Sequence, residues 1–366
     1  PHVPIQSLSA GVPVLHRSLL AKWPANERTV VGLNDELMRV FKGPRVLFPD
    51  GFSKTEHNVR AVYFEKPATF THSIGVIAGP AKDKALLKFA AVYLRSSLAR
   101  YFLMMRGWKM LCERNGVHLT DVETFPFFDP SAAPKPKAAA RALERVEEVM
   151  DELENLSDLE QLPRYQKLQE QLDGLVFDYF GLNPLERELV RETVRVLMPS
   201  VRPRSYKSLD TPAQHPASKA DFALYAKTLA DALTSWREKL DGRGHFNVRV
   251  VTSQPSREGP QGIVRIVYSA KETTAGVSEI ALDDALLSVT LRELRRQGLA
   301  AIPSGDALQL VPDARIWTKD SLSLVRPLVQ RNWTMRVALR DAEDIVRTIQ
   351  SKQKPQRSRR KADARG

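Results

Sequence analysis

Residues 84–106 read KALLKFAAVYLRSSLARYFLMMR, and apolar side chains recur in this stretch every three or four residues. That spacing is typical of one face of an amphipathic helix, so the sequence predicts a single long helix here. Three shorter runs precede it, at residues 45–48, 61–64 and 73–78, and each is rich in apolar residues and is followed closely by proline or glycine. Such runs predict short strands. The first part of the chain is therefore expected to have a mixed α/β fold.

Proline-rich stretches divide the rest of the chain. Pro134-Lys135-Pro136 predicts a stiff linker after the first section. Four prolines among serine, arginine and lysine predict a second linker further along. We therefore expect a multi-domain α/β (α+β) protein. Its expected parts are a small mixed α/β domain at 1–130, a helical spacer at 137–198, a linker at 199–218, a second α/β domain at 219–350 and a basic disordered tail at 351–366.

Apolar periodicity and breaker residues also predict the elements within these parts. Helices are expected at 137–162, 164–180, 185–198, 221–240 and 283–297. Strands are expected at 247–252, 262–269, 307–311 and 315–317. A terminal helix is expected to begin near Leu322 or later and to end at Gln350.

The 366 residues carry a formal net charge of +12, from 55 Lys and Arg against 43 Asp and Glu. This charge is uneven, because residues 141–192 hold fourteen acidic and six basic side chains and the rest of the chain therefore carries +20. Strongly basic segments favour a polyanion as partner, and phosphate neutralisation by Lys and Arg supplies most non-specific affinity for nucleic acid. The charge therefore indicates nucleic acid, with a high isoelectric point that serves only solubility as the alternative.

Cysteine content and hydropathy restrict the cellular context. Cys112 is the only cysteine, which excludes a disulfide framework and a thiolate metal cage and is typical of a reducing cytosol. No uncharged apolar run approaches the length of a membrane span, so no membrane partner is expected. The chain begins with Pro1 and has no signal-peptide pattern, which indicates a processed product or a piece of a longer polypeptide.

Familiar catalytic motifs are absent from the sequence. Its one G-x-G pattern, Gly242-Arg243-Gly244, follows a predicted helix, whereas a dinucleotide or S-adenosylmethionine site needs a glycine-rich turn after a strand. There is no phosphate-binding P-loop, and no Asp/Asn-Pro-Pro-aromatic motif of the kind that amino-methyltransferases use to hold a flipped base. No carboxylate–lysine spacing of metal-dependent nucleases and no zinc-type histidine pair occurs. The chain is therefore expected to perform no chemistry alone, with no catalytic or metal residue assigned.

Several stretches follow one another in an informative order. They are residues 44–48, 70–74, the helix that reaches Tyr101, the segment 113–122 with Phe125-Pro126-Phe127 after it, the Val176-Phe177-Asp178-Tyr179-Phe180-Gly181-Leu182 unit, and residues 333–344 with Trp333-Thr334 and Asp344. In this order they resemble the C-terminal part of bacterial adenine-specific DNA methyltransferases of restriction-modification systems. The resemblance is to the region after the catalytic domain, where the target-recognition domain lies, and it covers about residues 40–350.

The resemblance implies DNA target recognition coupled to adenine methylation, with residues 1–130 as the recognition domain. The methyl-donor and base-holding motifs are missing, so it implies no cofactor in this chain and S-adenosylmethionine on an associated catalytic domain. Its implied partners are double-stranded DNA, the methyltransferase catalytic domain or subunit, and subunits of a restriction or anti-phage defence complex. The implied location is the bacterial cytoplasm, in association with the nucleoid.

Candidate DNA contacts are basic or polar residues in loops and at helix ends, where side chains reach phosphates and base edges. A solvated hairpin, a favourable helix dipole and a core tryptophan are the ordinary alternatives for these positions. The candidate set is Arg45, Lys54, His57, Asn58, Arg60, Arg106, Trp108, Lys109, Arg114, Arg202, Arg204 and Lys207.

Two hypotheses from other classes remain. One is a specificity subunit like those of type I restriction systems, although those carry two similar recognition domains and the two α/β sections here are not evidently similar. The other is a protein-interaction scaffold whose basic charge is incidental, and such a scaffold should show no salt-dependent DNA binding. An enzyme with an unfamiliar active site ranks below both.

Overall fold

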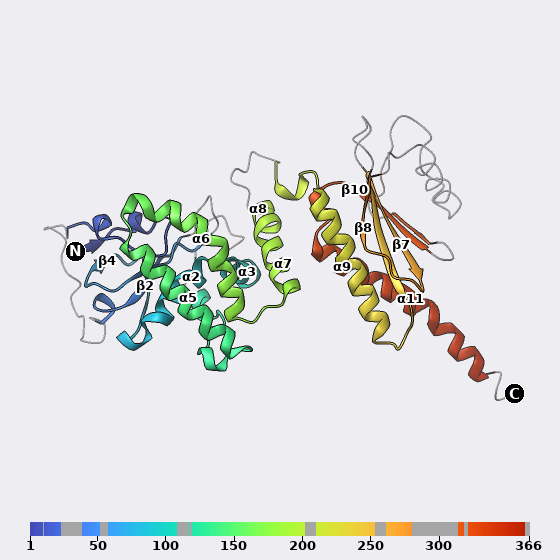
Figure 1. Ribbon diagram of the computed structural model, residues 1–366, viewed down its shortest axis with the longest axis horizontal. Coiled ribbons are helices and arrows are strands. Elements are labelled where there is room, and N and C mark those ends of the chain that lie inside the picture. The colour runs from blue at the N-terminus through green and yellow to red at the C-terminus, as the bar shows by residue number, and fades with distance from the viewer. Residues whose placement is uncertain are drawn as a thin grey trace. The chain divides into compact units, whose positions relative to one another are not determined.

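The computed structural model describes residues 1–9, 11–22, 39–51, 58–107, 117, 119–201, 210–252, 261–279, 314–317 and 321–362. It confirms the mixed α/β character, because helices and small sheets occur in both halves of the chain (Figure 1). Two compact units divide the chain, unit 1 at Pro1–Ser208 and unit 2 at Leu209–Gly366. The boundary between the units falls inside the predicted linker at 199–218.

Unit 1 begins with short strands and continues with helices. Its strands are β1 (His2–Val3), β2 (Arg45–Pro49), β3 (Val62–Phe64), β4 (Thr69–Phe70) and β5 (Ile74–Ala78). Its α-helices are α2 (Lys84–Arg95), α3 (Ser97–Arg106), α4 (Leu119–Glu123), α5 (Pro136–Asn155), α6 (Asp158–Tyr179), α7 (Pro184–Glu192) and α8 (Met198–Val201). The π-helical turn η6 (Thr193–Leu197) joins α7 to α8. Short 3-10 turns lie at Ile5–Ser9, Arg17–Leu19, Arg39–Phe41, Ala81–Asp83 and Pro130–Ala132.

Strand β2 is the centre of the main sheet of unit 1. The strand order is β3-β2-β5 and both pairs are antiparallel, with Val46 opposite Tyr63 and Ile77. All residues of β2 are buried, since alternate side chains enter two different cores. Val46 packs in the core that includes α2, whereas Leu47 packs with the N-terminal segment. This arrangement explains why Val46, Leu47 and Phe48 form a continuous apolar run instead of alternating with polar residues.

Residues 137–198 pack into the core of unit 1, so they do not form the separate helical spacer that the sequence predicted. Val146 and Met150 of α5 and Phe177 of α6 lie fully buried in one cluster with Phe89 of α2. The apolar stripe that predicted a helical hairpin therefore packs against α2 as well as against its partner helix. Some acidic residues of these helices, such as Glu144 and Glu148, are exposed, whereas Asp151 pairs with the buried Lys88 of α2.

The predicted helix over 84–106 is two helices, because Ser96 interrupts it. Ser96 is in an extended conformation, with φ −70° and ψ 164°, and its hydroxyl accepts a hydrogen bond of 3.2 Å from the amide of Ala99. Serine is a favoured residue at a helix N-cap for this reason. The new N-terminus of α3 faces α6, where Asp173 accepts a bond of 2.7 Å from the amide of Ser97. Local capping and a distant carboxylate together end α2 at Arg95.

The described residues of unit 2 form one sheet and two long helices. The helices are α9 (Lys219–Glu238) and α11 (Met335–Ala362), and the strands are β6 (His245–Thr252), β7 (Gln261–Ser269), β8 (Gly276–Glu279), β9 (Ala314–Trp317) and β10 (Ser321–Pro327). Short 3-10 turns lie at Pro212–Gln214 and Gln330–Asn332. The strand order is β8-β6-β7-β10-β9, in which only β6 and β8 pair in parallel.

Both helices of unit 2 cover the same face of its sheet. Leu229 of α9 and Ile345 of α11 share a buried cluster with the sheet residues Val250, Val264 and Leu324. These three strand residues lie opposite one another in the register, so they belong to one face. Figure 1 shows α9 lying along the sheet beside α11. The sheet therefore has an inner face, which holds the core, and an outer face on the other side.

The structure changes two expectations for the C-terminal part. Residues 321–327 form β10, so the terminal helix begins at Met335 and not near Leu322. This helix also continues to Ala362, through most of the stretch expected to be a disordered tail. The expected helix at 283–297 and the strand at 307–311 lie outside the described residues.

Candidate functional site

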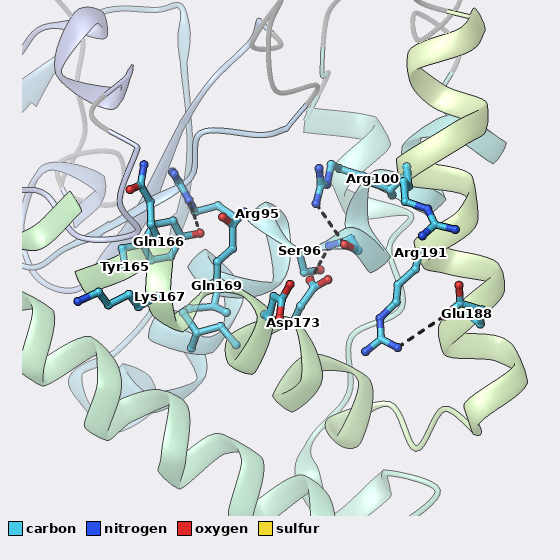
Figure 2. Close-up of a pocket in the computed structure, with 16 residues that line it drawn as sticks. Arg95, Ser96, Arg100, Tyr165, Gln166, Lys167, Gln169, Asp173, Glu188 and Arg191 are labelled. Atoms are coloured by element: carbon cyan, nitrogen blue, oxygen red, sulfur yellow. Dashed lines mark hydrogen bonds and ion pairs between the residues drawn. The ribbon is translucent and has the colours of Figure 1, made fainter. Parts of the chain in front are cut away.

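The candidate site is a polar pocket of about 710 Å³ in unit 1. Three walls enclose it: the junction between α2 and α3, the middle of α6, and α7 with its π-helical turn (Figure 2). The side chains that line it are Val92, Arg95, Ser96, Ser97, Arg100, Tyr165, Gln166, Lys167, Gln169, Glu170, Leu172, Asp173, Glu188, Arg191, Val194 and Arg195.

The first wall of the pocket is the junction where α2 ends and α3 begins. At this break the first amides of α3 point toward α6, and the carboxylate of Asp173 accepts from the amide of Ser97. The hydroxyl of Ser97 in turn accepts a bond of 3.1 Å from Nη2 of Arg100. Figure 2 shows Asp173 directed at this helix end, with Arg100 beyond it. The pocket floor therefore combines a helix N-terminus, a carboxylate and a guanidinium in one hydrogen-bonded group.

Arg95 supports this wall from inside the fold. Its side chain is buried, and its Nη1 donates a bond of 3.2 Å to the backbone oxygen of Ala61. Its Nε donates to the hydroxyl of Tyr165 at 3.3 Å, and its guanidinium lies 5.3 Å from the centre of that ring. These contacts join α2, α6 and the segment before β3. Arg95 therefore holds the pocket in shape while it contributes positive charge beneath the surface.

Arg191 and Arg195 form the opposite wall. They are one helical turn apart, and both side chains are exposed. The guanidinium carbon of Arg191 lies 5.5 Å from the ring centre of Phe177. Its Nη1 is 3.8 Å from a carboxylate oxygen of Glu188, which is long for an ion pair. Such a pair adds little stability and leaves donors available. Arg195 lies in the π-helical turn, and turns of this kind are often found at functional sites.

The pocket carries a net positive charge and several types of hydrogen-bonding group. Five basic residues face three carboxylates, and two glutamine amides add both donors and acceptors. Arginine and glutamine are the side chains that most often bond guanine and adenine edges, and carboxylates accept from cytosine amines. Arginine also binds phosphate through two parallel bonds. The pocket can therefore bind a ligand that has both phosphates and polar ring edges.

The structure places two of the predicted contact residues in the interior. Arg45 is fully buried, and its guanidinium donates bonds of 2.6 and 2.7 Å to the backbone oxygens of Gly43 and Lys66. Burial lowers the pKa of Arg45 to about 10, which leaves it charged at neutral pH. Asn58 is also buried, at 5% exposure. The expectation that Arg45 and Asn58 contact DNA is therefore corrected, because neither side chain reaches the surface of unit 1.

Two predicted residues remain accessible, although the structure does not bring them together with the pocket floor. Arg60 is half-buried before β3, and Arg106 is exposed at the end of α3 opposite to the pocket. The other predicted contacts lie outside the described residues. They are Lys54, His57, Trp108, Lys109, Arg114, Arg202, Arg204 and Lys207.

Sequence reasoning missed the residues that line the pocket. Arg191 and Arg195 have an i, i+4 spacing, which does indicate that they share a helix face. Their helix was interpreted as part of an acidic spacer, however, so the pair was not considered. Arg100 and Asp173 are far apart in the sequence and meet only through the packing of α3 on α6. No local pattern could have shown this meeting.

Neither a cluster of metal-ligating side chains nor a glycine turn of the nucleotide-binding type occurs among the described residues. No group of three His, Cys, Asp or Glu side chains with ligand geometry occurs among them. Gly242 and Gly244 lie in the turn from α9 to β6, so they follow a helix and precede a strand. A nucleotide-type glycine turn has the reverse order. Within the same residues, no helix combines the length and the apolar character needed to span a bilayer.

No protein-family model matches the chain, and no curated protein matches its sequence.

Proposed function

We propose that this chain is the DNA target-recognition region of an adenine-specific DNA methyltransferase from a restriction-modification or anti-phage system. The observation that carries the proposal is the arginine-lined pocket at the break between α2 and α3. It supplies phosphate-binding guanidinium groups beside the amide and carboxylate groups that can read base edges. The sequence resemblance supplies the link to adenine methylation.

In this proposal unit 1 docks on duplex DNA with the pocket at the interface. Arg191 and Arg195 contact phosphates from the wall formed by α7 and η6, and Arg100 and Asp173 face the bases. Arg95 keeps α2 and α6 in place and does not itself touch the duplex. Transfer of the methyl group takes place on a catalytic domain outside this chain, which binds S-adenosylmethionine.

The test uses the full chain and two double variants with equal charge. R191Q/R195Q removes two guanidinium groups from the pocket, and R141Q/R145Q removes two at the same i, i+4 spacing from the exposed side of α5. Binding to a random-sequence duplex is measured by fluorescence anisotropy at salt concentrations from about 50 to 200 mM. We expect the pocket variant to reduce the slope of log K against log salt by about 1.8, and the α5 variant to reduce it much less.

Two results would contradict the proposal. Equal loss of affinity in both variants would mean that only net charge matters, and would remove the pocket from the interface. Absence of salt-dependent binding by the wild-type chain would favour the scaffold hypothesis over any DNA-binding function.

A further inference from the structure

The outer face of the unit 2 sheet carries two arginines directly opposite each other. Arg249 of β6 pairs with Arg265 of β7 in the antiparallel register, and both side chains are exposed. Side chains at such positions have Cβ atoms about 5 Å apart, and like charges there destabilise a sheet. Neither arginine has an ion pair or a side-chain hydrogen bond to any part of the chain that the structure describes. The sheet therefore holds two close cations whose repulsion is offset by no carboxylate among the residues that the structure describes.

The surroundings of the two arginines leave room for a ligand. In the same row of the sheet, Gly276 of β8 lies beside Arg249, and a Cβ atom built there would meet only a backbone oxygen 3.9 Å away. On the other side, Ser323 of β10 lies opposite Arg265 and adds a hydroxyl. The row therefore crosses four neighbouring strands, with open space at β8, a guanidinium group on each of β6 and β7, and a hydroxyl on β10.

Neighbouring rows define the limits of this surface. On one side Val251, Ile263 and Val325 are buried. On the other side Asn247 donates bonds of 2.9 and 3.0 Å to Ser269 and to the backbone of Lys271, and so fixes the loop after β7. That loop also holds the exposed Glu272, whose charge offsets that of Lys271. Among the described residues, the two arginines therefore determine the net charge of this surface.

We propose that this outer face is a second binding site, which takes the phosphodiester backbone of a nucleic acid. Guanidinium groups bind phosphate oxygens in pairs, and a phosphate between Arg249 and Arg265 would convert their mutual repulsion into attraction. The whole of unit 2 favours the same ligand, since residues 209–366 hold 26 Lys and Arg against 18 Asp and Glu, two thirds of the net charge of the chain. Arginine and serine contacts of this kind position a duplex and do not read its sequence.

This site lies in a different unit from the pocket of the proposed function and shares with it only the class of ligand. Its role would be to add sequence-independent affinity to the recognition that unit 1 provides. Because the two sites use separate residues, variants of each can be compared in one assay on the full chain.

The experiment compares R249Q/R265Q with the matched control K227Q/R340Q. Lys227 on α9 and Arg340 on α11 are exposed residues of unit 2, and their substitution removes the same charge from helices and not from the outer sheet face. The probe is a random-sequence duplex of about 30 base pairs, studied by anisotropy at about 50 to 200 mM salt. Thermal unfolding of each variant establishes that the fold is retained.

We expect R249Q/R265Q to lower the salt slope by about 1.8, which at about 100 mM salt corresponds to an affinity loss between tenfold and a hundredfold. The control should keep a slope close to that of the wild type. An unchanged slope in R249Q/R265Q, or the same loss in the control, would overturn the proposal.

The outcomes separate this proposal from the proposed function. A loss in R191Q/R195Q with wild-type binding in R249Q/R265Q would leave the pocket and remove the sheet site. The reverse pattern would leave the sheet site and remove the pocket. A wild-type chain that fails to bind the duplex overturns both. Binding of phosphatidylserine vesicles that depends on Arg249 and Arg265, with duplex binding unaffected by their loss, would assign the surface to lipid headgroups and overturn a nucleic-acid ligand.

Discussion

Tyr179 shows how a single buried side chain links the fold of unit 1 to pH. Its hydroxyl donates to the backbone oxygen of Phe128, and its ring stacks on Phe89 at a centroid distance of 4.0 Å. Burial raises the pKa of Tyr179 to about 12, from an ordinary value of 10.0. The folded state therefore keeps this proton at a pH where the unfolded chain loses it.

The consequence is that unit 1 should lose stability as the pH rises between about 10 and 12. In this range the unfolded tyrosine is ionised and the folded one is still neutral, so each step up in pH favours unfolding. We expect Y179F to show a smaller decline in the free energy of unfolding than the wild type over that range. Urea denaturation at several pH values measures the decline.

Tyr93 provides the control for this prediction. Burial raises the pKa of Tyr93 as well, but its hydroxyl has no hydrogen-bond partner among the described residues. Y93F should therefore also reduce the decline at high pH. At neutral pH it should cost almost nothing, whereas Y179F should cost about 1 kcal/mol through its lost hydrogen bond. If both variants kept the pH dependence of the wild type, neither Tyr93 nor Tyr179 would be its source.

At the scale of elements, local patterns predict those parts of the fold whose cause is local. Strands β6 and β7 match the predicted ranges closely, because alternating or continuous apolar residues and flanking turns determine them. The break at Ser96 was missed because the apolar stripe continues through it and its second cap, Asp173, comes from α6. The apolar stripe of α5 can be seen in the sequence, but its packing against α2 cannot.

The same distinction applies to the candidate site. Basic residues on a helix face are visible in the sequence, but the pocket exists only where α3, α6 and α7 meet. Arg45 shows the opposite error, since a basic residue at the start of a strand looked accessible and is fully buried. Charge in the sequence indicates a class of partner, and tertiary packing decides which charges reach it.

The paired arginines of the unit 2 sheet lead to a prediction about its stability. Like charges at directly opposite positions destabilise a sheet by about 0.2–1 kcal/mol, and salt screens this repulsion. We expect R265Q, without nucleic acid, to raise the free energy of unfolding of unit 2 by about this amount at low salt, and the gain to fall as salt is added. K227Q, which removes an exposed charge from α9, should show no comparable gain. A loss of stability in R265Q at low salt would contradict the register-based argument.

At the scale of the whole molecule, the two units have separate hydrophobic cores. Unit 1 is built around two buried clusters and unit 2 around another, and no residue belongs to clusters of both units. We therefore expect two unfolding transitions in differential scanning calorimetry of the full chain. A substitution in one core should move one transition and leave the other in place.

Asp341 is the position at which this expectation can be tested most clearly. Its carboxylate accepts bonds of 2.8 Å from Arg326 and 2.6 Å from the hydroxyl of Tyr225. The side chains of Asp341 and Arg326 are both almost completely buried. D341N leaves the buried guanidinium of Arg326 without its counter-charge, which typically costs about 3 kcal/mol or more. For a unit of this size that loss lowers one transition by roughly 6–12 °C.

The control for D341N is D344N in the same helix. Asp344 forms a half-exposed ion pair of 3.1 Å with Arg315, and such a pair contributes about 0–1 kcal/mol. D344N should therefore shift the same transition by only a few degrees. A shift of both transitions by D341N would show that the two units unfold together. Equal shifts by D341N and D344N would show that the buried Arg326–Asp341 pair stabilises unit 2 no more than the half-exposed Arg315–Asp344 pair does.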